Sequence, residues 1–192
     1  MTARLSRIIG IATAALLTAG AAAAPPAGAV AGDSGTEHCI MDSGNGEQRC
    51  FATFPEAIAA ATEGRVTDAP ATVRTGTAGA EFRAEMKRFG TSQQAEAGEV
   101  VQGTFFDDGQ FGGSSLTVYG SAPCKKDGWV EYQYDVSEDW KNRISSVQPW
   151  ADCWIWLYPE RGLGGDRDGP FKENTADIGT LMNDRTQSIG FS

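Results

Sequence analysis

The segment Phe106-Asp-Asp-Gly-Gln-Phe-Gly-Gly113 and its later counterpart Tyr158-Pro-Glu-Arg-Gly-Leu-Gly-Gly165 contain the pattern that decides the fold. Each segment begins with an aromatic residue and continues with four polar or small residues. A large apolar residue, a spacer and a glycine follow. Because the pattern occurs twice with corresponding positions at one fixed offset, the sequence predicts an internal duplication.

A polar cluster that ends in serine follows each segment: Lys141-Asn-Arg-Ile-Ser-Ser146 in the first copy and Asn183-Asp-Arg-Thr-Gln-Ser188 in the second. The two clusters are closer together by about ten residues than the two aromatic segments are. The first copy therefore contains about ten additional residues. Their simplest location is the loop from Gly120 to Gly128, around Cys124.

Residues 1–31 have the features of a secretory signal peptide. Arg4 and Arg7 precede an apolar run that ends near Ala24, and small residues suited to cleavage follow. An uncleaved transmembrane helix is the alternative, but alanine and glycine dilute the run and two prolines end it. The sequence therefore predicts a secreted, extracellular protein.

The charge of the mature chain limits the class of partner. Removal of residues 1–31 takes away two of the 16 basic residues and none of the 25 acidic ones, so the net charge changes from −9 to −11. Such a charge disfavours nucleic acid and, after signal cleavage, membrane surfaces as partners, whereas it favours cations.

Export makes disulfide bonds the expected state of the four cysteines. Among the three connectivities we favour Cys39 with Cys50 and Cys124 with Cys153, because each pair lies within one compositional segment and closes a short loop. A zinc site is the alternative, but the chain has no Cys-x-x-Cys spacing and its only histidine, His38, adjoins Cys39. We interpret His38 as an exposed loop residue.

The mature chain divides into two parts with different patterns. Residues 32–98 are alanine-rich and predict a small disulfide-containing helical segment followed by a linker. A Thr-x-x-Glu capping box predicts a helix near 55–62. An apolar stripe with helical spacing predicts a second helix over 78–89, and residues 90–98 have the composition of a linker.

From residue 99 onward the apolar period becomes two, which is typical of β-strands with one buried face. Trp154 and Trp156 should share a face opposite Cys153 and Ile155. Short strands separated by Gly-, Asp- and Asn-rich turns predict an antiparallel sandwich or barrel of about eight strands over residues 99–192.

The duplicated signatures resemble the paired Greek-key motifs of the βγ-crystallins, over residues 99–192. In that family the glycine permits a backbone conformation that a Cβ atom would obstruct, and the aromatic residue packs over the hairpin as a corner. The resemblance implies a mainly β fold, a βγ-crystallin-type double Greek-key sandwich preceded by a small helical segment. The matching positions are Phe106, Phe111, Gly113, Tyr158, Leu163 and Gly165, of which Leu163 departs from the usual aromatic.

The serine-ending clusters resemble the calcium motif of the same family. The resemblance implies that the two clusters exchange ligands, so that Ser145 acts with Asp184, and Gln187 with Asn142. Hydroxyl, carboxylate and amide oxygens are ligands that Ca²⁺ accepts. The second pair lacks the hydroxyl, and Lys141 stands where an acid or amide is usual, so we expect one weak Ca²⁺ site. The alternative is that these residues only cap hairpins.

The mature chain also resembles a group of secreted actinobacterial proteins placed with the Streptomyces metalloproteinase inhibitor and a killer-toxin-like protein. The segment from Cys39 to Cys50 and the run Met-Asn-Asp-Arg-Thr near the C-terminus carry this resemblance. Because a shared fold does not transmit function, the group supplies a hypothesis only.

No catalytic residues are predicted. With one histidine beside a cysteine, neither a Ser-His-Asp nor a Cys-His arrangement is supported. The adjacent acids Asp107-Asp108 and Glu138-Asp139 are more typical of solvated turns than of a glycosidase pair.

We therefore expect a non-enzymatic, monomeric protein that binds another protein outside the cell, with peptidase inhibition as the leading hypothesis. Inhibition requires a stiff exposed loop, which the bridge from Cys124 to Cys153 would supply. The alternatives are a carbohydrate- or cell-surface-binding antimicrobial module, which requires a solvent-facing tryptophan, and a calcium-binding structural protein.

Overall fold

The computed structural model describes residues 35–73, 77–91 and 99–192, which belong to one compact unit, Gly32–Ser192. The predicted signal peptide and residues 92–98 of the predicted linker lie outside these ranges. Among the described residues, we find no helix with the length and apolar character needed to cross a bilayer.

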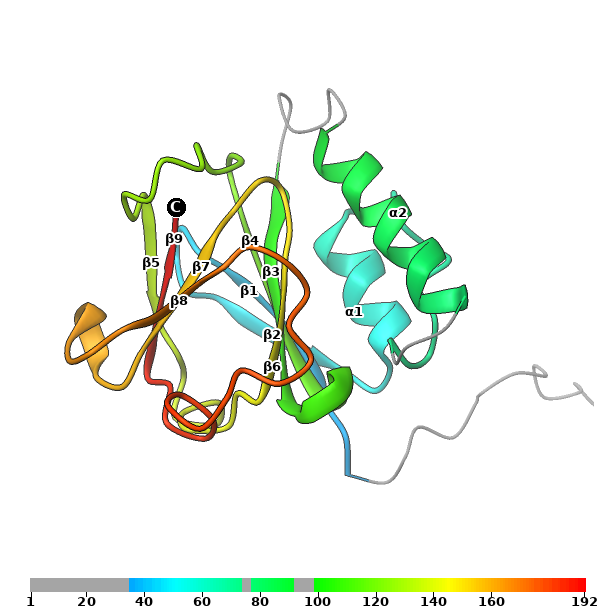
Figure 1. The fold of residues 1–192 in the computed structure, drawn as a ribbon. Helices are drawn as coiled ribbons and strands as arrows, with labels where there is room; N and C mark the ends of the chain where they lie inside the picture. The colour runs from blue at the N-terminus through cyan, green and yellow to red at the C-terminus, as the bar shows by residue number, and fades with distance from the viewer. Residues whose placement is uncertain (1–34, 74–76, 92–98) are drawn as a thin grey trace, which may run out of the picture. The chain divides into compact units, whose positions relative to one another are not determined.

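Two β-sheets pack against each other, and two helices cover the outer face of one of them (Figure 1). The five-stranded sheet consists, in spatial order, of β2 (Gln48–Phe51), β1 (His38–Asp42), β4 (Gly112–Gly120), β3 (Val100–Asp108) and β6 (Ser146–Pro149). The four-stranded sheet consists of β5 (Tyr132–Asp135), β9 (Ser188–Phe191), β7 (Ile155–Tyr158) and β8 (Asp168–Phe171). Strand β1 runs parallel to β4, whereas the other paired strands are antiparallel.

The two sequence copies exchange segments between the sheets, as a double Greek key requires. Strand β5 of the first copy pairs with β9 of the second, and Thr175 of the second copy forms a bridge to Val147 of β6. The predicted mainly β, two-sheet fold is thus confirmed. Residues 99–192 contain seven strands among the described elements, and the expected eighth is reduced to the single bridge at Thr175.

The duplicated signatures form two matching corners. After β3 and β7 the chain makes short 3₁₀ turns, η2 (Gly109–Phe111) and η3 (Arg161–Leu163). Both corners hold left-handed residues at equivalent places: Phe111 and Leu163 have φ of 58° and 62°. Gly113 and Gly165 follow with φ of 70° and 79°, and a Cβ atom on either would clash with a neighbouring side chain.

The two helices form where local signals predict them. Helix α1 (Phe54–Ala61) begins at Thr53, whose side chain accepts a hydrogen bond from the Glu56 N–H while the Glu56 carboxylate accepts one from the Thr53 N–H. Helix α2 (Thr77–Thr91) buries the predicted apolar stripe. The residues of this stripe are Phe82, Met86 and Phe89.

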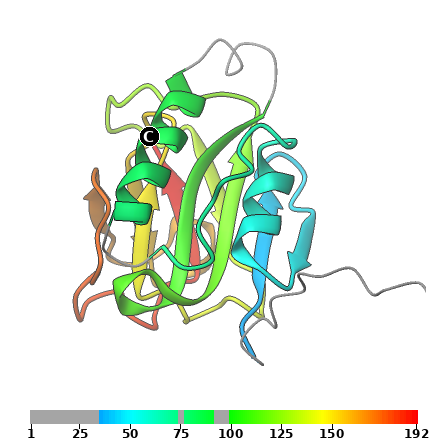
Figure 2. The ribbon, with the colours of Figure 1, turned by 90° about the vertical axis from the view of Figure 1, so that its right-hand side faces the viewer.

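The helical segment and the β-domain share a core, which corrects the division expected at residue 98. One apolar cluster lies between the two sheets, and a second lies between the five-stranded sheet and the helices. Figure 2 shows the two helices in front of the five-stranded sheet. In the second cluster, Phe54 packs on Phe106 with ring centroids 6.0 Å apart, and Phe82 packs on Trp150 at 5.9 Å. Residues 32–98 also supply β1 and β2, strands that the alanine-rich composition did not indicate.

Candidate protein-binding loop

The loop between β4 and β5, at the top of Figure 1, contains the additional residues of the first copy. We call residues 121–131 the clamped loop. A disulfide joins Cys124 to Cys153, and a second joins Cys39 to Cys50, so both predicted pairings are confirmed. The Cys124 bridge ties the loop to the turn between β6 and β7, and the Cys124 N–H donates to the Ala151 carbonyl at 3.2 Å.

Further contacts hold the rest of the clamped loop. The Glu131 carboxylate accepts a hydrogen bond from the Lys125 N–H at 2.9 Å and forms an ion pair with the Lys125 ammonium at 3.1 Å. Lys126 forms an ion pair with Asp152. At the loop exit, the Glu131 N–H donates to the Phe191 carbonyl at 2.8 Å. The loop is therefore fixed by covalent, ionic and main-chain contacts.

Trp129 projects from the clamped loop with 79% of its surface exposed. Asp127 accepts a hydrogen bond from the Trp129 N–H at 2.9 Å, which closes a tight turn, and Gly128 has φ of 85°. In contrast, Trp140, Trp150 and Trp156 are less than 10% exposed, at 2%, 7% and 8%. A tryptophan held in water by an ordered turn is unusual for a residue that is highly buried on average.

The outer face of the four-stranded sheet lies beside this loop and carries further indole rings. Trp154 and Trp156 lie opposite Cys153 and Ile155, as predicted, since Cys153 and Ile155 belong to the inter-sheet core. Lys172 lies over the Trp154 ring at 3.6 Å and Arg167 over the Trp156 ring at 3.9 Å. One face of each ring is therefore already occupied by a cation.

The serine-ending clusters meet at the opposite end of the β-domain and are joined through their backbones. The Asn142 N–H donates to the Thr186 carbonyl at 2.9 Å, and the Asp184 N–H donates to the Ile144 carbonyl at 3.2 Å. This exchange brings the two clusters side by side, with Asn142 and Asp184 both in the left-handed conformation. The two clusters lie close together, and the assignment of their side chains as Ca²⁺ ligands remains a prediction.

The side chains of the four expected ligands differ in exposure. Ser145 is buried, Gln187 is half-buried, and Asn142 and Asp184 are exposed. Asp184 accepts a hydrogen bond from the Asn183 amide at 2.8 Å. The closing serines, in contrast, have a defined structural role: Ser146 and Ser188 each bind the backbone of their own corner.

His38 is buried in β1, which corrects its interpretation as an exposed loop residue. Its Nδ1 atom lies 2.9 Å from the Ser115 hydroxyl, and its ring packs edge-on against Phe54. Burial lowers the pKa of His38, and the charge of Asp107 acts in the opposite direction. Because Ser115 has no exposed surface, this histidine and serine offer no nucleophile to a substrate.

One group of metal-ligating side chains occurs among the described residues: Glu37, Cys39 and Cys50. The two sulfur atoms are joined in a disulfide, so neither is a thiolate that could bind zinc. The group therefore carries no metal site.

The exposure of Trp129 is the main feature of this loop that the sequence did not single out. The available signal was the turn-forming Asp127-Gly128 pair directly before it, within the additional residues of the first copy. The alternation of apolar and polar residues could not reveal this exposure, because Trp129 precedes the strand that begins at Tyr132.

The chain is similar to several solved structures. No family model and no curated protein matches the chain. Solved structures that match include a βγ-crystallin domain from Clostridium beijerinckii, at 18% identity, over 47% of this chain and 95% of that chain, with a TM-score of 0.37. The N-terminal domain of Protein S matches at 22% identity, over 47% of this chain and 94% of that chain, with a TM-score of 0.37. A βγ-crystallin domain from Flavobacterium johnsoniae matches at 19% identity, over 47% of this chain and 92% of that chain, with a TM-score of 0.36. At such scores the likeness adds no weight to the strand pairing described above.

Proposed function

We propose that the chain is a secreted, non-enzymatic protein that binds an extracellular peptidase through the clamped loop and inhibits it. The observation that carries the proposal is the exposure of Trp129, 79%, on a loop fixed by the Cys124–Cys153 disulfide. Tryptophan is enriched among residues that dominate the binding energy of protein interfaces. The two disulfides are consistent with an extracellular setting.

The rigidity of the loop supports inhibition in particular. A loop that is ordered before binding loses little conformational entropy on association. Lys126 and Gly128 have φ of 57° and 85°, so the backbone before Trp129 is turned rather than extended. The loop therefore offers a side-chain anchor for an aromatic-accepting specificity pocket, and it offers no extended strand for cleavage.

An inhibition panel tests the proposal. The mature chain, residues 32–192, is assayed against chymotrypsin, subtilisin and thermolysin, and in parallel is used to capture peptidases from secreted culture proteins. We expect inhibition of at least one peptidase, with the inhibitor recovered uncut. Inhibition of none, and capture of none, would overturn the proposal.

Carbohydrate binding is the second candidate, because Trp129 is exposed to solvent and directly follows Gly128, which lies beside the half-buried ring of Trp154. This version includes the cell-surface-directed antimicrobial alternative. Sedimentation with chitin, cellulose and peptidoglycan separates the two candidates. Retention on a polysaccharide that Trp129→Ala abolishes, without inhibition of any peptidase, would favour the carbohydrate version.

A further inference from the structure

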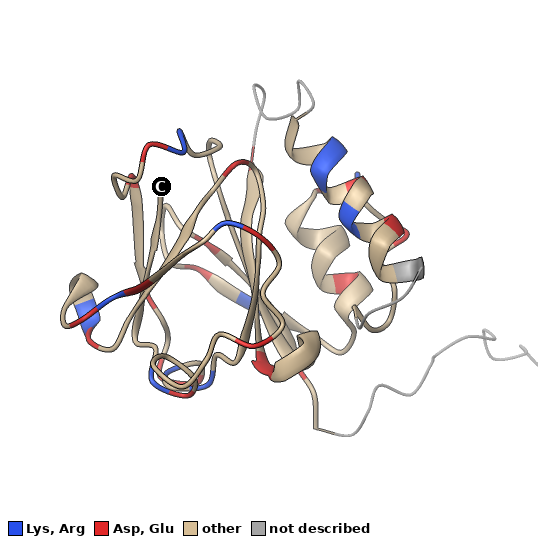
Figure 3. Cartoon of the chain, in the orientation of Figure 1, with Lys and Arg blue, Asp and Glu red and all other residues tan. Residues whose placement is uncertain are grey.

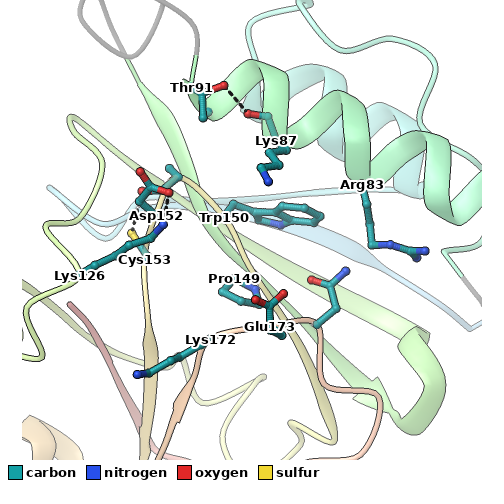
Figure 4. A pocket seen from close by; sticks show the side chains of 13 residues that line it. Arg83, Lys87, Thr91, Lys126, Pro149, Trp150, Asp152, Cys153, Lys172 and Glu173 are labelled. Carbon is teal, nitrogen blue, oxygen red and sulfur yellow. Dashed lines mark hydrogen bonds and ion pairs between the residues drawn. The ribbon is translucent and has the colours of Figure 1, made fainter.

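A cavity of about 370 Å³ lies between the C-terminal half of α2, the turn between β6 and β7, and the segment after β8. Figure 4 shows this cavity from close by. Its floor includes Pro149 and Trp150, and the Trp150 Nε1–H is turned away into the sheet, where it donates to the Thr104 hydroxyl at 3.0 Å. Such a volume is at the lower end of the range for small-molecule sites.

The cavity lining is basic, in contrast to the acidic chain. Four basic residues line it, Arg83, Lys87, Lys126 and Lys172, against the two acids Asp152 and Glu173. Figure 3 shows that α2 carries basic residues near its C-terminal half. A local excess of positive charge on a chain with an overall net charge of −9 concentrates anions at this position.

The basic groups differ in how far they are already neutralised. Lys126 is paired with Asp152, and Lys172 lies over Trp154. Within the described part of the chain, neither Arg83 nor Lys87 forms an ion pair with a carboxylate. In Figure 4 the Lys87 ammonium lies above Trp150, toward the cavity. These two cations are therefore the groups free to receive an anion.

The turn that forms one wall is held in a costly conformation. Ala151 and Asp152 are consecutive non-glycine residues with φ of 46° and 63°. Left-handed backbone at such residues persists only where surrounding contacts impose it, and it is frequent at ligand sites. Here the Cys153 N–H donates to the Trp150 carbonyl at 2.8 Å, and the disulfide fixes Cys153. The wall is thus pre-organised.

We propose that this cavity binds a small carboxylate-bearing ligand of the sugar-acid class. The carboxylate would lie between Arg83 and Lys87, which suit charge-assisted hydrogen bonds to it. The ring would lie against Trp150 and Pro149, and Glu173 and Asn174 on the opposite wall would accept and donate hydrogen bonds to ring hydroxyls. The site is separate from Trp129, which does not line the cavity.

Titration of the mature chain with glucuronate, followed by NMR at the Trp150 indole N–H, tests this assignment. Glucuronate should bind, and glucose, its neutral counterpart, should bind at least tenfold more weakly. Benzoate and acetate form a second arm: binding as tight as that of glucuronate would show that any small carboxylate suffices and would overturn the sugar-acid class. Absence of a shift with every carboxylate would overturn the site itself.

Variants on α2 locate the binding. Lys87→Gln and Arg83→Gln should each weaken glucuronate about tenfold, whereas Lys87→Arg should retain most of the affinity. Arg88→Gln is the matched control, since Arg88 is an exposed neighbour on the same helix that does not line the cavity. Equal losses for Arg88→Gln and Lys87→Gln would show non-specific attraction and would contradict the proposal. Trp129→Ala should leave the affinity for glucuronate unchanged, so this test is independent of peptidase inhibition.

Discussion

Replacement of Ser146 by alanine should destabilise the protein more than replacement of Ser188, although the two serines occupy equivalent positions in the two copies. The Ser146 hydroxyl donates to the Asp108 carbonyl at 2.8 Å and accepts the Phe111 N–H at 3.1 Å. Alanine removes both bonds at once and leaves two main-chain groups of the corner without these partners.

The size of each loss follows from burial. Phe111 is 6% exposed and packs on Phe106 with ring centroids 5.7 Å apart, so water cannot readily replace the lost hydroxyl. An unsatisfied buried polar group costs about 1–3 kcal/mol, so we expect a loss of about 2–4 kcal/mol for Ser146→Ala.

The equivalent bonds of Ser188 join the Glu160 carbonyl at 2.6 Å and the Leu163 N–H at 3.0 Å. Glu160 is exposed, as Asp108 is in the first copy, so the two corners differ at the other partner. Leu163 is only half-buried where Phe111 is buried, so water can take the place of the hydroxyl at the Leu163 N–H. We expect a loss of about 1–2 kcal/mol for Ser188→Ala.

Urea unfolding of the mature chain and the two variants measures these free energies directly. Ser121→Ala, at an exposed serine of the clamped loop, is the control and should lie within about 0.5 kcal/mol of the parent. A loss for Ser188→Ala equal to or larger than that for Ser146→Ala would refute the reasoning from burial.

Three further predictions concern titration, metal and covalent structure. Burial lowers the pKa of His38 in the folded state, so the unfolded chain binds the proton first as the pH falls. The free energy of unfolding should therefore fall as the pH drops below about 6.5. Urea unfolding at pH 5–8 measures this pH dependence, and His38→Asn should make it weaker. Millimolar CaCl₂ should raise the melting temperature of the parent but not of Asp184→Asn, and an unchanged parent would leave the clusters as hairpin caps. Replacing both Cys124 and Cys153 with serine should lower the free energy of unfolding by roughly 3.6 kcal/mol, because it removes a cross-link with a sequence separation of 29. The same replacement should abolish binding to the peptidase, and retained binding would show that the disulfide is not needed for it.

The features that the sequence predicted correctly depend on local signals. The capping box at Thr53, the apolar stripe of α2 and the disulfide pairing within each segment all involve residues close in the chain. The duplicated corners were recognisable because a left-handed backbone at Gly113 and Gly165 imposes a specific residue type.

The features that the sequence missed depend on distant contacts. Strand β1 pairs with β4 across the chain, for example His38 with Ser115, and no period within either segment encodes that choice. The same pairing buries His38 and joins the helical segment to the β-domain in one core. The exposure of Trp129 likewise depends on the disulfide and ion pairs that hold the clamped loop, which a composition-based argument does not contain.

The affinity of the inhibited peptidase for the mature chain and two single variants tests the central claim most directly. Trp129→Ala should weaken binding by at least 2 kcal/mol, about 30-fold, in isothermal titration calorimetry. Leu181→Ala is the matched control, because Leu181 is the other exposed large apolar residue among those described, at 46% exposure, and lies outside the clamped loop. The account predicts a large loss for Trp129→Ala and none for Leu181→Ala. Equal affinities for the parent and Trp129→Ala would contradict it.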